Sequence, residues 1–253
     1  MSKPAGPRQS ASMQQALRDG LVPAALLAGQ VRSDVSVAMF DLAQWRDHLR
    51  EASDVVDAAE AARAAKQRRA TDRQTRVLAY ALHRLLLAEV LDCAPAEVPL
   101  HRDARGCPRL RDDALFTSLS HAGERVAIAV SALGPVGIDV ESLEQAAGMP
   151  ELAAQVAHPD EWHVLQRLDP ARRGHELLAL WVRKEALLKA AGIGLERGMD
   201  TFAAPWEVPL PLPEGPFHGR RVVLHALHDA GWIGAVAAPP GARLAFAQSP
   251  GPG

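Results

Sequence analysis

The sequence lacks the features that would assign it to a specialised class of protein. Only two cysteines, Cys93 and Cys107, occur in 253 residues, which excludes a disulfide framework, and no CxxC or Cys/His cluster predicts a zinc site. The formal net charge is only −2, so an anionic ligand must be held by local cations. No stretch approaches the roughly 20 apolar residues that cross a bilayer, and the N-terminus does not resemble a signal peptide. We therefore expect a cytoplasmic protein that binds neither nucleic acid nor membrane.

What is present is typical of an ordinary globular protein. Apolar residues make up 48% and charged residues 23%, and the length suffices for one large domain or two small ones. Residues 1–32 mix Pro, Gly, Ser, Gln and Ala without clear periodicity, which predicts a loose N-terminal tail, and residues 248–253 predict a second tail.

Periodicity between the tails predicts a mixture of helices and strands. Apolar residues recur at helical spacing over residues 58–91 and 176–191, the second segment ending at Gly192. Short β-branched or alternating runs predict strands at residues 35–40, 116–119, 126–130, 136–140, 222–227 and 232–237. Because these elements do not follow a strict βαβ rhythm, we expect an α+β fold.

The first candidate site lies in the strand Gly137-Ile138-Asp139-Val140-Glu141. Side chains two apart in a strand share a face, so Asp139 and Glu141 project together. Two adjacent carboxylates repel each other unless a cation lies between them, and oxygen ligands suit magnesium. A polar strand end is the simpler alternative for a bare DxE.

The second candidate site lies on the predicted helix over residues 176–191. Trp181, Glu185 and Lys189 are four apart and form one stripe, which is compatible with a surface ion pair or with the wall of a cleft. A carboxylate and an ammonium beside a metal would serve phosphoryl transfer.

A third candidate site lies at Ser120-His121, where histidine either holds a phosphate or caps a turn. These two residues point to opposite faces of a strand, which is the wrong geometry for a nucleophile and its base.

In order along the chain, these segments resemble the Sfp-type 4′-phosphopantetheinyl transferases. The family pattern is close to SHS, then GIDIE, then WxxKEAxxKxxGxGL. It is matched by Phe116-Thr117-Ser118-Leu119-Ser120-His121, by Gly137-Ile138-Asp139-Val140-Glu141, and by the stretch from Trp181 to Leu195. The resemblance covers roughly residues 60–205. It implies two similar α+β lobes related by a pseudo-twofold axis, here residues 33–133 and 134–247, with coenzyme A between them.

The resemblance also implies roles for individual residues. Asp139, Glu141 and Glu185 match the carboxylates that hold magnesium, and Lys189 matches the lysine that reaches the pyrophosphate and assists the departing 3′,5′-ADP. Ser120 and His121 match the coenzyme A contacts. Arg76, and less directly Arg69, match the cation on the 3′-phosphate.

One position departs from the family pattern. Where the family commonly has Gly-Lys-Pro, this chain has Gly106-Cys107-Pro108, so a cation near the nucleotide is missing and Arg105 or Arg109 could replace it.

The resemblance implies a holo-[acyl-carrier-protein] synthase type of transferase. It would move 4′-phosphopantetheine from coenzyme A to a serine of an apo acyl, polyketide or peptidyl carrier protein and release 3′,5′-ADP. Glu185, directly or through a bound water, is the expected base, and a monomer is expected. The alternatives are a magnesium-dependent nuclease and a coenzyme A or carrier-protein binding module without activity.

Overall fold

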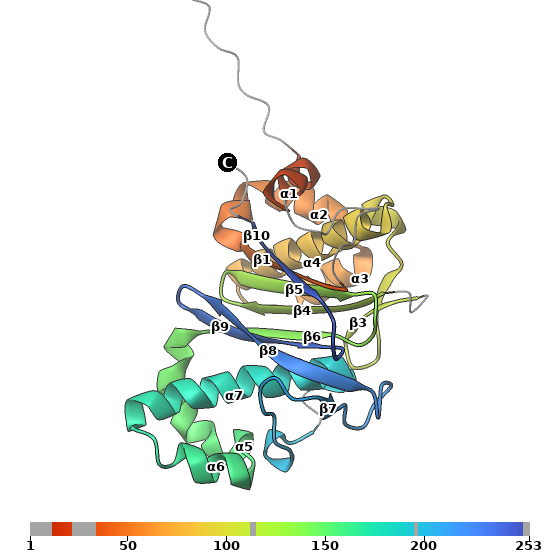
Figure 1. Cartoon of the computed structure of the whole chain (residues 1–253). Coiled ribbons are helices and arrows are strands. Elements are labelled where there is room, and N and C mark those ends of the chain that lie inside the picture. Colours follow the sequence, from red (N-terminus) through yellow and green to blue (C-terminus); the bar gives the residue numbers. More distant parts are fainter. Residues whose placement is uncertain (1–11, 22–33, 112–114, 195–196, 250–253) are drawn as a thin grey trace, which may run out of the picture.

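The computed structural model describes residues 12–21, 34–111, 115–194 and 197–249. Figure 1 shows four layers: a group of helices around α4 (Ala70–Leu91), a first sheet, a second sheet, and a group of helices around α7 (Pro170–Ala191). The long helices thus lie on the outer faces of two stacked sheets. Each layer buries one apolar face against its neighbour, which is how two-sheet α+β proteins exclude water.

The first sheet contains four strands. In spatial order they are β10 (Leu244–Ser249), β1 (Val35–Asp41), β5 (Arg125–Ser131) and β4 (Phe116–Ala122). β1 pairs antiparallel with β5 and parallel with β10, and β5 pairs antiparallel with β4. β10, near the end of the chain, therefore lies beside β1, the earliest strand of this sheet. The sequence did not predict this strand.

The second sheet repeats the arrangement. In spatial order its strands are β6 (Gly137–Ser142), β9 (Trp232–Ala238), β8 (Arg221–Asp229) and the short β7 (Leu210–Pro211), all antiparallel neighbours. A separate two-stranded sheet pairs β2 (Leu100–Arg102) with β3 (Pro108–Leu110).

The remaining elements are short and surround the two long helices. The α-helices are α1 (Met13–Leu21), α2 (Leu49–Val55), α3 (Ala58–Ala65), α5 (Ala153–Val156) and α6 (Pro159–Leu165). The 3₁₀ segments among the described residues are η1 (Leu42–His48), η2 (Pro95–Glu97), η3 (Leu143–Leu152) and η5 (Met199–Thr201).

Three clusters of buried apolar side chains correspond to the spaces between the layers. One packs α1 and α4 on the first sheet, and includes Phe40, Trp45 and Leu82. Another packs α7 on the second sheet. The third lies between the sheets and includes Val37 from β1 and Ile138 from β6. Since Ile138 and Val140 fill this middle core, the odd-numbered residues of β6 face the opposite way, toward α7.

Local sequence explains where the two long helices begin and end. The predicted helix over residues 58–91 is two helices, because Asp57 and Glu60 form a capping box on α3 and α4 starts anew at Ala70. Asp169 caps the N-terminus of α7 and Pro170 occupies its first position, so this helix begins six residues before the predicted start. Gly192 ends it with φ +71°, as its position predicted.

The prediction of a loose N-terminal tail is wrong for residues 13–21. Helix α1 buries Met13 and Leu17 in the first core, and Arg18 forms an ion pair with Glu89 of α4 at 2.8 Å. Its apolar residues are spaced by three and four but are too few to stand out in a polar, small-residue composition, so only tertiary contacts reveal the helix. The second predicted tail is wrong at residues 248–249, which belong to β10, and predicted tail residues 1–11, 22–32 and 250–253 lie outside the described residues.

The prediction of an α+β fold is confirmed. Helices and strands are mixed, the sheets are mainly antiparallel, and the helices cover their outer faces. All six predicted strands are present, at β1, β4, β5, β6, β8 and β9.

Candidate active site

A close approach between β6 and α7 builds the site. A Cβ atom placed on Gly137 would lie 1.9 Å from the carbonyl oxygen of Ala186 and 2.5 Å from the amide nitrogen of Ala190. Only glycine therefore allows the strand to lie directly on the helix. Asp139 and Glu141 follow Gly137 on the same face, which brings both carboxylates to the stripe of α7 that carries Glu185 and Lys189.

Asp139 is the centre of a buried polar network. Its side chain is nearly inaccessible, and its Oδ1 accepts hydrogen bonds from Lys189 Nζ at 2.6 Å and from Ser120 Oγ at 2.7 Å. Lys189 also donates to Ser120 Oγ at 3.0 Å. Since Ser120 belongs to β4 in the first sheet and the other two residues to the second sheet and its helix, this triangle joins the two sheets.

Two serines of β4 connect its edge to β6. Ser118 Oγ accepts a hydrogen bond from the amide of Ile138 at 3.1 Å, and Ser120 Oγ accepts a longer one from Val140 at 3.4 Å. Serine side chains thus satisfy donors of β6 that would otherwise be buried without a partner. The predicted contact residue Ser120 is therefore fully engaged inside the protein, where it positions Asp139 and Lys189.

The other two predicted carboxylates, Glu185 and Glu141, both have a raised pKa, as expected for acidic groups that are buried close together. Burial, and then the charge of Asp139, raise the pKa of Glu185 to about 7 against the opposing effect of Lys189. The same two causes raise the pKa of Glu141 to about 7, with a further contribution from Glu185. Asp139 thus acts on both glutamates, and a bound cation would relieve the repulsion.

These residues fit a hard divalent cation that completes its coordination with other ligands. Asp139 Oδ2 is buried and has no hydrogen-bond partner among the described residues. In the described ranges, no group of three His, Cys, Asp or Glu side chains lies close enough together to hold a metal ion as it stands. Magnesium usually takes one or two carboxylates together with substrate phosphates and waters, so the oxygen donors present suit it without such a group.

Trp181, the third residue of the predicted stripe, belongs to the edge of the second core. It is half-buried and packs against the apolar cluster beneath α7.

Cations gather beside His121, at the end of β4. Burial, and then the charges of Arg76, Lys189 and Arg102, lower the pKa of His121 to about 4. His121 is therefore neutral near pH 7 and lies in a positive field, where an anion would be stabilised. Arg69, by contrast, is exposed at the N-cap of α4, and no hydrogen bond or ion pair connects its side chain to these residues in the described part of the chain.

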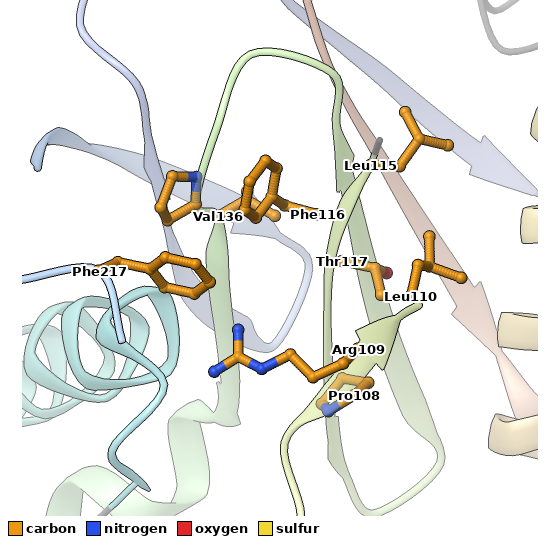
Figure 2. A pocket seen from close by; sticks show the side chains of 9 residues that line it. Pro108, Arg109, Leu110, Leu115, Phe116, Thr117, Val136 and Phe217 are labelled. Carbon is orange, nitrogen blue, oxygen red and sulfur yellow. The ribbon is translucent and has the colours of Figure 1, made fainter. Parts of the chain in front are cut away.

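Arg109, one of the two candidates to replace the missing lysine, is engaged elsewhere. Its Nε donates to Asp103 Oδ2 at 3.1 Å, and its guanidinium lies 4.7 Å over the ring of Phe217. Figure 2 shows this side chain beneath a small pocket, with Phe116 and Phe217 above it; their ring centroids are 5.4 Å apart. Arg109 thus helps to pack β3 and β4 against the segment after β7.

Sequence reasoning missed Arg102 and Tyr80 as parts of this region. Arg102 ends β2, a strand of three residues that no periodicity could predict, and its guanidinium lies 4.6 Å over the Tyr80 ring.

Comparisons with known proteins point to the same region. Residues 135–220 match the family model described as the 4′-phosphopantetheinyl transferase superfamily. A provisionally named 4′-phosphopantetheinyl transferase of Synechocystis is 30% identical over 144 residues, covering 56% of this chain and 58% of that protein. The 4′-phosphopantetheinyl transferase HetI of Nostoc is 30% identical over 118 residues, covering 45% and 50%. A 4′-phosphopantetheinyl transferase of Bacillus subtilis is 31% identical over 112 residues, covering 43% and 48%.

The chain spans about half the length of the curated relatives it matches. Among the described helices, none is long and apolar enough to cross a membrane. The matched segment contains β6, α7 and all four of the residues Asp139, Glu141, Glu185 and Lys189. The resemblance of this chain to the 4′-phosphopantetheinyl transferase family, first indicated by three motifs, is therefore confirmed.

Proposed function

We propose that this chain transfers 4′-phosphopantetheine from coenzyme A to a serine of an apo acyl or peptidyl carrier protein, in a magnesium-dependent reaction. The observation that carries the proposal is the buried network of Asp139, Lys189 and Ser120 beside two carboxyls of raised pKa. It combines oxygen ligands for a cation with a fixed ammonium, as phosphoryl transfer requires. The named relatives support the same activity.

In this reaction the serine Oγ bonds to the β-phosphorus of coenzyme A, and the bond from that phosphorus to the bridging oxygen breaks. The leaving group is 3′,5′-ADP. Magnesium, held by Asp139, Glu141 and Glu185, would offset negative charge on the pyrophosphate.

The protein side chains supply the remaining steps. Glu185 accepts the serine proton, directly or through a bound water. Lys189, fixed by Asp139 at 2.6 Å, places its ammonium beside the leaving phosphate oxygen. His121 remains a neutral donor, and the cations around it favour the nucleotide phosphates.

The two-lobe arrangement, with boundaries at residues 33–133 and 134–247, belongs to this proposal. Its support is a repeated order of elements: β1, α4, β4, β5 in one half and β6, α7, β8, β9 in the other. In both halves the first strand pairs with the last, and the last pairs with the middle one. The proposal places the coenzyme A site between these halves, where β4 packs beside β6.

We further propose a monomer that works in the cytoplasm and is of the holo-[acyl-carrier-protein] synthase type. The two cysteines are unpaired, as in a reducing compartment. The net charge of −2 gives no general attraction to nucleic acid or to an anionic membrane.

The test is incubation of the purified chain with magnesium, coenzyme A and an apo carrier protein, followed by mass spectrometry of the carrier. The expected result is a carrier heavier by one phosphopantetheinyl group, dependent on both magnesium and coenzyme A. An unmodified carrier together with a cleaved nucleic acid substrate would favour a nuclease. Bound coenzyme A without any transfer would favour a binding module.

A further inference from the structure

Arg109 connects the strand β3 to the end of α7, the helix of the candidate active site. Its guanidinium lies 4.7 Å over the ring of Phe217, and its Nε donates to Asp103 Oδ2 at 3.1 Å. A Cβ atom placed on Gly192 would overlap Arg109 Nη2, so the guanidinium lies directly on the residue that ends α7. Arg109 therefore joins two segments that are far apart in the sequence.

The C-terminal end of α7 is a favourable place for this cation. The last carbonyl groups of a helix have no partner within the helix and carry partial negative charge, which a positive group stabilises. Arg109 Nη2 is buried and has no hydrogen-bond partner among the described residues. The charge of Arg109 is therefore balanced by Asp103 on one side and by the end of α7 on the other.

The segment after β7 closes over this contact. A Cβ atom placed on Gly215 would lie 2.7 Å from the carbonyl oxygen of Ala191, so this segment lies on the last turn of α7. Two residues later, Phe217 packs edge-on against Phe116 at the start of β4, with ring centroids 5.4 Å apart. Figure 2 shows Arg109 extending beneath these two rings. The guanidinium is thus enclosed between the helix end and an aromatic pair that is anchored on β4.

The part of α7 that Arg109 contacts is bonded directly to Lys189. The amide of Gly192 donates to the carbonyl oxygen of Lys189 at 3.1 Å. At its other end, Lys189 Nζ is held by Ser120 and Asp139. Lys189 is therefore restrained through its backbone as well as through its side chain. Such restraint matters for an ammonium that must meet a phosphate oxygen, because a misplacement of about 1 Å can slow a reaction by about 100-fold.

We propose that Arg109 is a positioning residue for Lys189: by holding the last turn of α7 against β3 and β4, it sets where the ammonium lies in the site. The inference rests on the proposed function for the reaction in which Lys189 acts. It gives Arg109 a role apart from substrate binding, since its guanidinium is engaged with Asp103, Phe217 and the helix end.

The experiment combines steady-state kinetics with hydrogen exchange. Carrier modification by the full chain is followed by mass for wild type, Arg109→Met and Arg109→Lys, each with and without Lys189→Met as a second substitution. Arg111→Met is the matched control, because Arg111 is an exposed arginine just after β3. Hydrogen exchange over residues 186–193 measures how firmly the last turn of α7 is held, without any need for turnover. Thermal denaturation shows whether each variant keeps its fold.

The kinetic effect is expected on kcat. Arg109→Met should lower kcat by about tenfold and change the KM for coenzyme A by less than about threefold, as for other residues that orient a functional group. Arg109→Lys should lose about threefold, because it keeps the charge at the helix end but not the planar group that stacks on Phe217. Arg111→Met should resemble wild type.

Two further results are specific to positioning. In the Lys189→Met background, Arg109→Met should change kcat by less than about twofold, since the group that it positions is already gone. In Arg109→Met, the amides of residues 186–193 should exchange about tenfold faster than in wild type, and those of residues 171–180 should exchange as in wild type.

Three outcomes would overturn the inference. If Arg109→Met raises the KM for coenzyme A and leaves kcat unchanged, Arg109 binds the substrate directly. If it lowers kcat equally with and without Lys189, its role is general stability. If the exchange of residues 186–193 is unchanged, Arg109 does not hold the end of α7.

Failure of the proposed function gives a different result. A wild-type chain that modifies no carrier would refute the proposed transfer, whereas faster exchange at residues 186–193 in Arg109→Met would still support the hold of Arg109 on the turn that contains Lys189. The two failures are therefore distinguishable.

Discussion

The two halves of the molecule share structural features but differ in the side chains that could take part in a reaction. We call β1, α3, α4, β4 and β5 the α4 unit, and β6, α6, α7, β8 and β9 the α7 unit. Both long helices have 22 residues, and each has a buried cation fourteen residues after its first residue, Arg84 (from 70) and Lys184 (from 170). Each cation pairs with a capping-box glutamate at the start of a short helix, Glu60 for Arg84 and Glu161 for Lys184.

The two units differ in the residues that follow these cations. After Lys184 the α7 unit has Glu185 and Lys189, which face Asp139. At the corresponding positions the α4 unit has Leu85, which is in the core, and Glu89, which binds Arg18. The α4 unit instead contributes the cation Arg76 and the residue His121, whose pKa is lowered by burial and by nearby positive charges that include Arg76. A repeated framework thus holds acidic and basic halves of one candidate site, and a few side chains decide which half is which.

The largest effect is expected where the α7 unit is chemically unique. Glu185→Gln and Asp139→Asn should lower carrier modification by about 10²- to 10³-fold or more, because each removes negative charge that orients a cation or accepts a proton. Glu176→Gln is the matched control, since nine residues at about 100° each place Glu176 on the opposite side of α7 from Glu185. Rates are measured by carrier mass at saturating coenzyme A. Near-normal transfer by Glu185→Gln would refute the assignment.

The next largest effect is a loss of stability when the buried cation that both units share is replaced. Lys184 donates to the carbonyls of Val156, Met199 and Phe202 at 2.6–2.8 Å and is inaccessible to solvent. Lys184→Met should lower the free energy of unfolding by about 3 kcal/mol or more, because the carbonyls and Glu161 lose a buried partner.

Arg84→Met should cost a similar amount, since Arg84 binds two carboxylates and the carbonyls of Pro95 and Val98. Urea denaturation monitored by circular dichroism measures both variants. A large loss for one and none for the other would mean that the two cations are not equivalent parts of the framework.

Sequence predicted the α7 unit better than the α4 unit, and the reason is physical. Asp139, Glu141, Glu185 and Lys189 lie at strand and helix periods, so local geometry already places each pair on one face. The convergence of Arg76 and Arg102 beside His121 depends on the packing of α4 and a three-residue strand, which no local period encodes. The strand β10 was missed because its pairing partner β1 is about 200 residues away in the chain.

The junction between the units gives a smaller and more selective effect. Ser120→Ala should lower turnover by about tenfold, because Lys189 and Asp139 lose the hydroxyl that fixes them, as for other groups that orient metal ligands. Ser118→Ala, two residues away, removes only a hydrogen bond to the amide of Ile138 and should reduce stability by about 1 kcal/mol with turnover nearly unchanged. Comparison of kcat with melting temperature separates the two roles. Equal losses of turnover in both variants would make Ser120 merely structural.

The smallest expected effect concerns the acidic half of the site. It is a change in how the stability of the protein depends on pH in the absence of divalent cations. Both Glu141 and Glu185 have a pKa raised from 4.5 to about 7, so the unfolded chain releases these protons before the folded one does. Stability conferred by the neutral carboxyls is therefore fully present below about pH 4.5 and is lost as the pH rises toward 7.

Glu141→Gln or Glu185→Gln should each reduce the loss of stability on raising the pH by about 1 kcal/mol, after allowance for solvent screening. This corresponds to about 2–4 °C in melting temperature. Glu176→Gln should leave the slope unchanged, because Glu176 does not act on either carboxyl. Thermal melts in chelator from pH 4.5 to 8 provide the measurement. If stability in chelator rose with pH over this range and the glutamine variants followed wild type, Glu141 and Glu185 would not be crowded carboxyls, and the contrast between an acidic and a basic half would lose its physical basis.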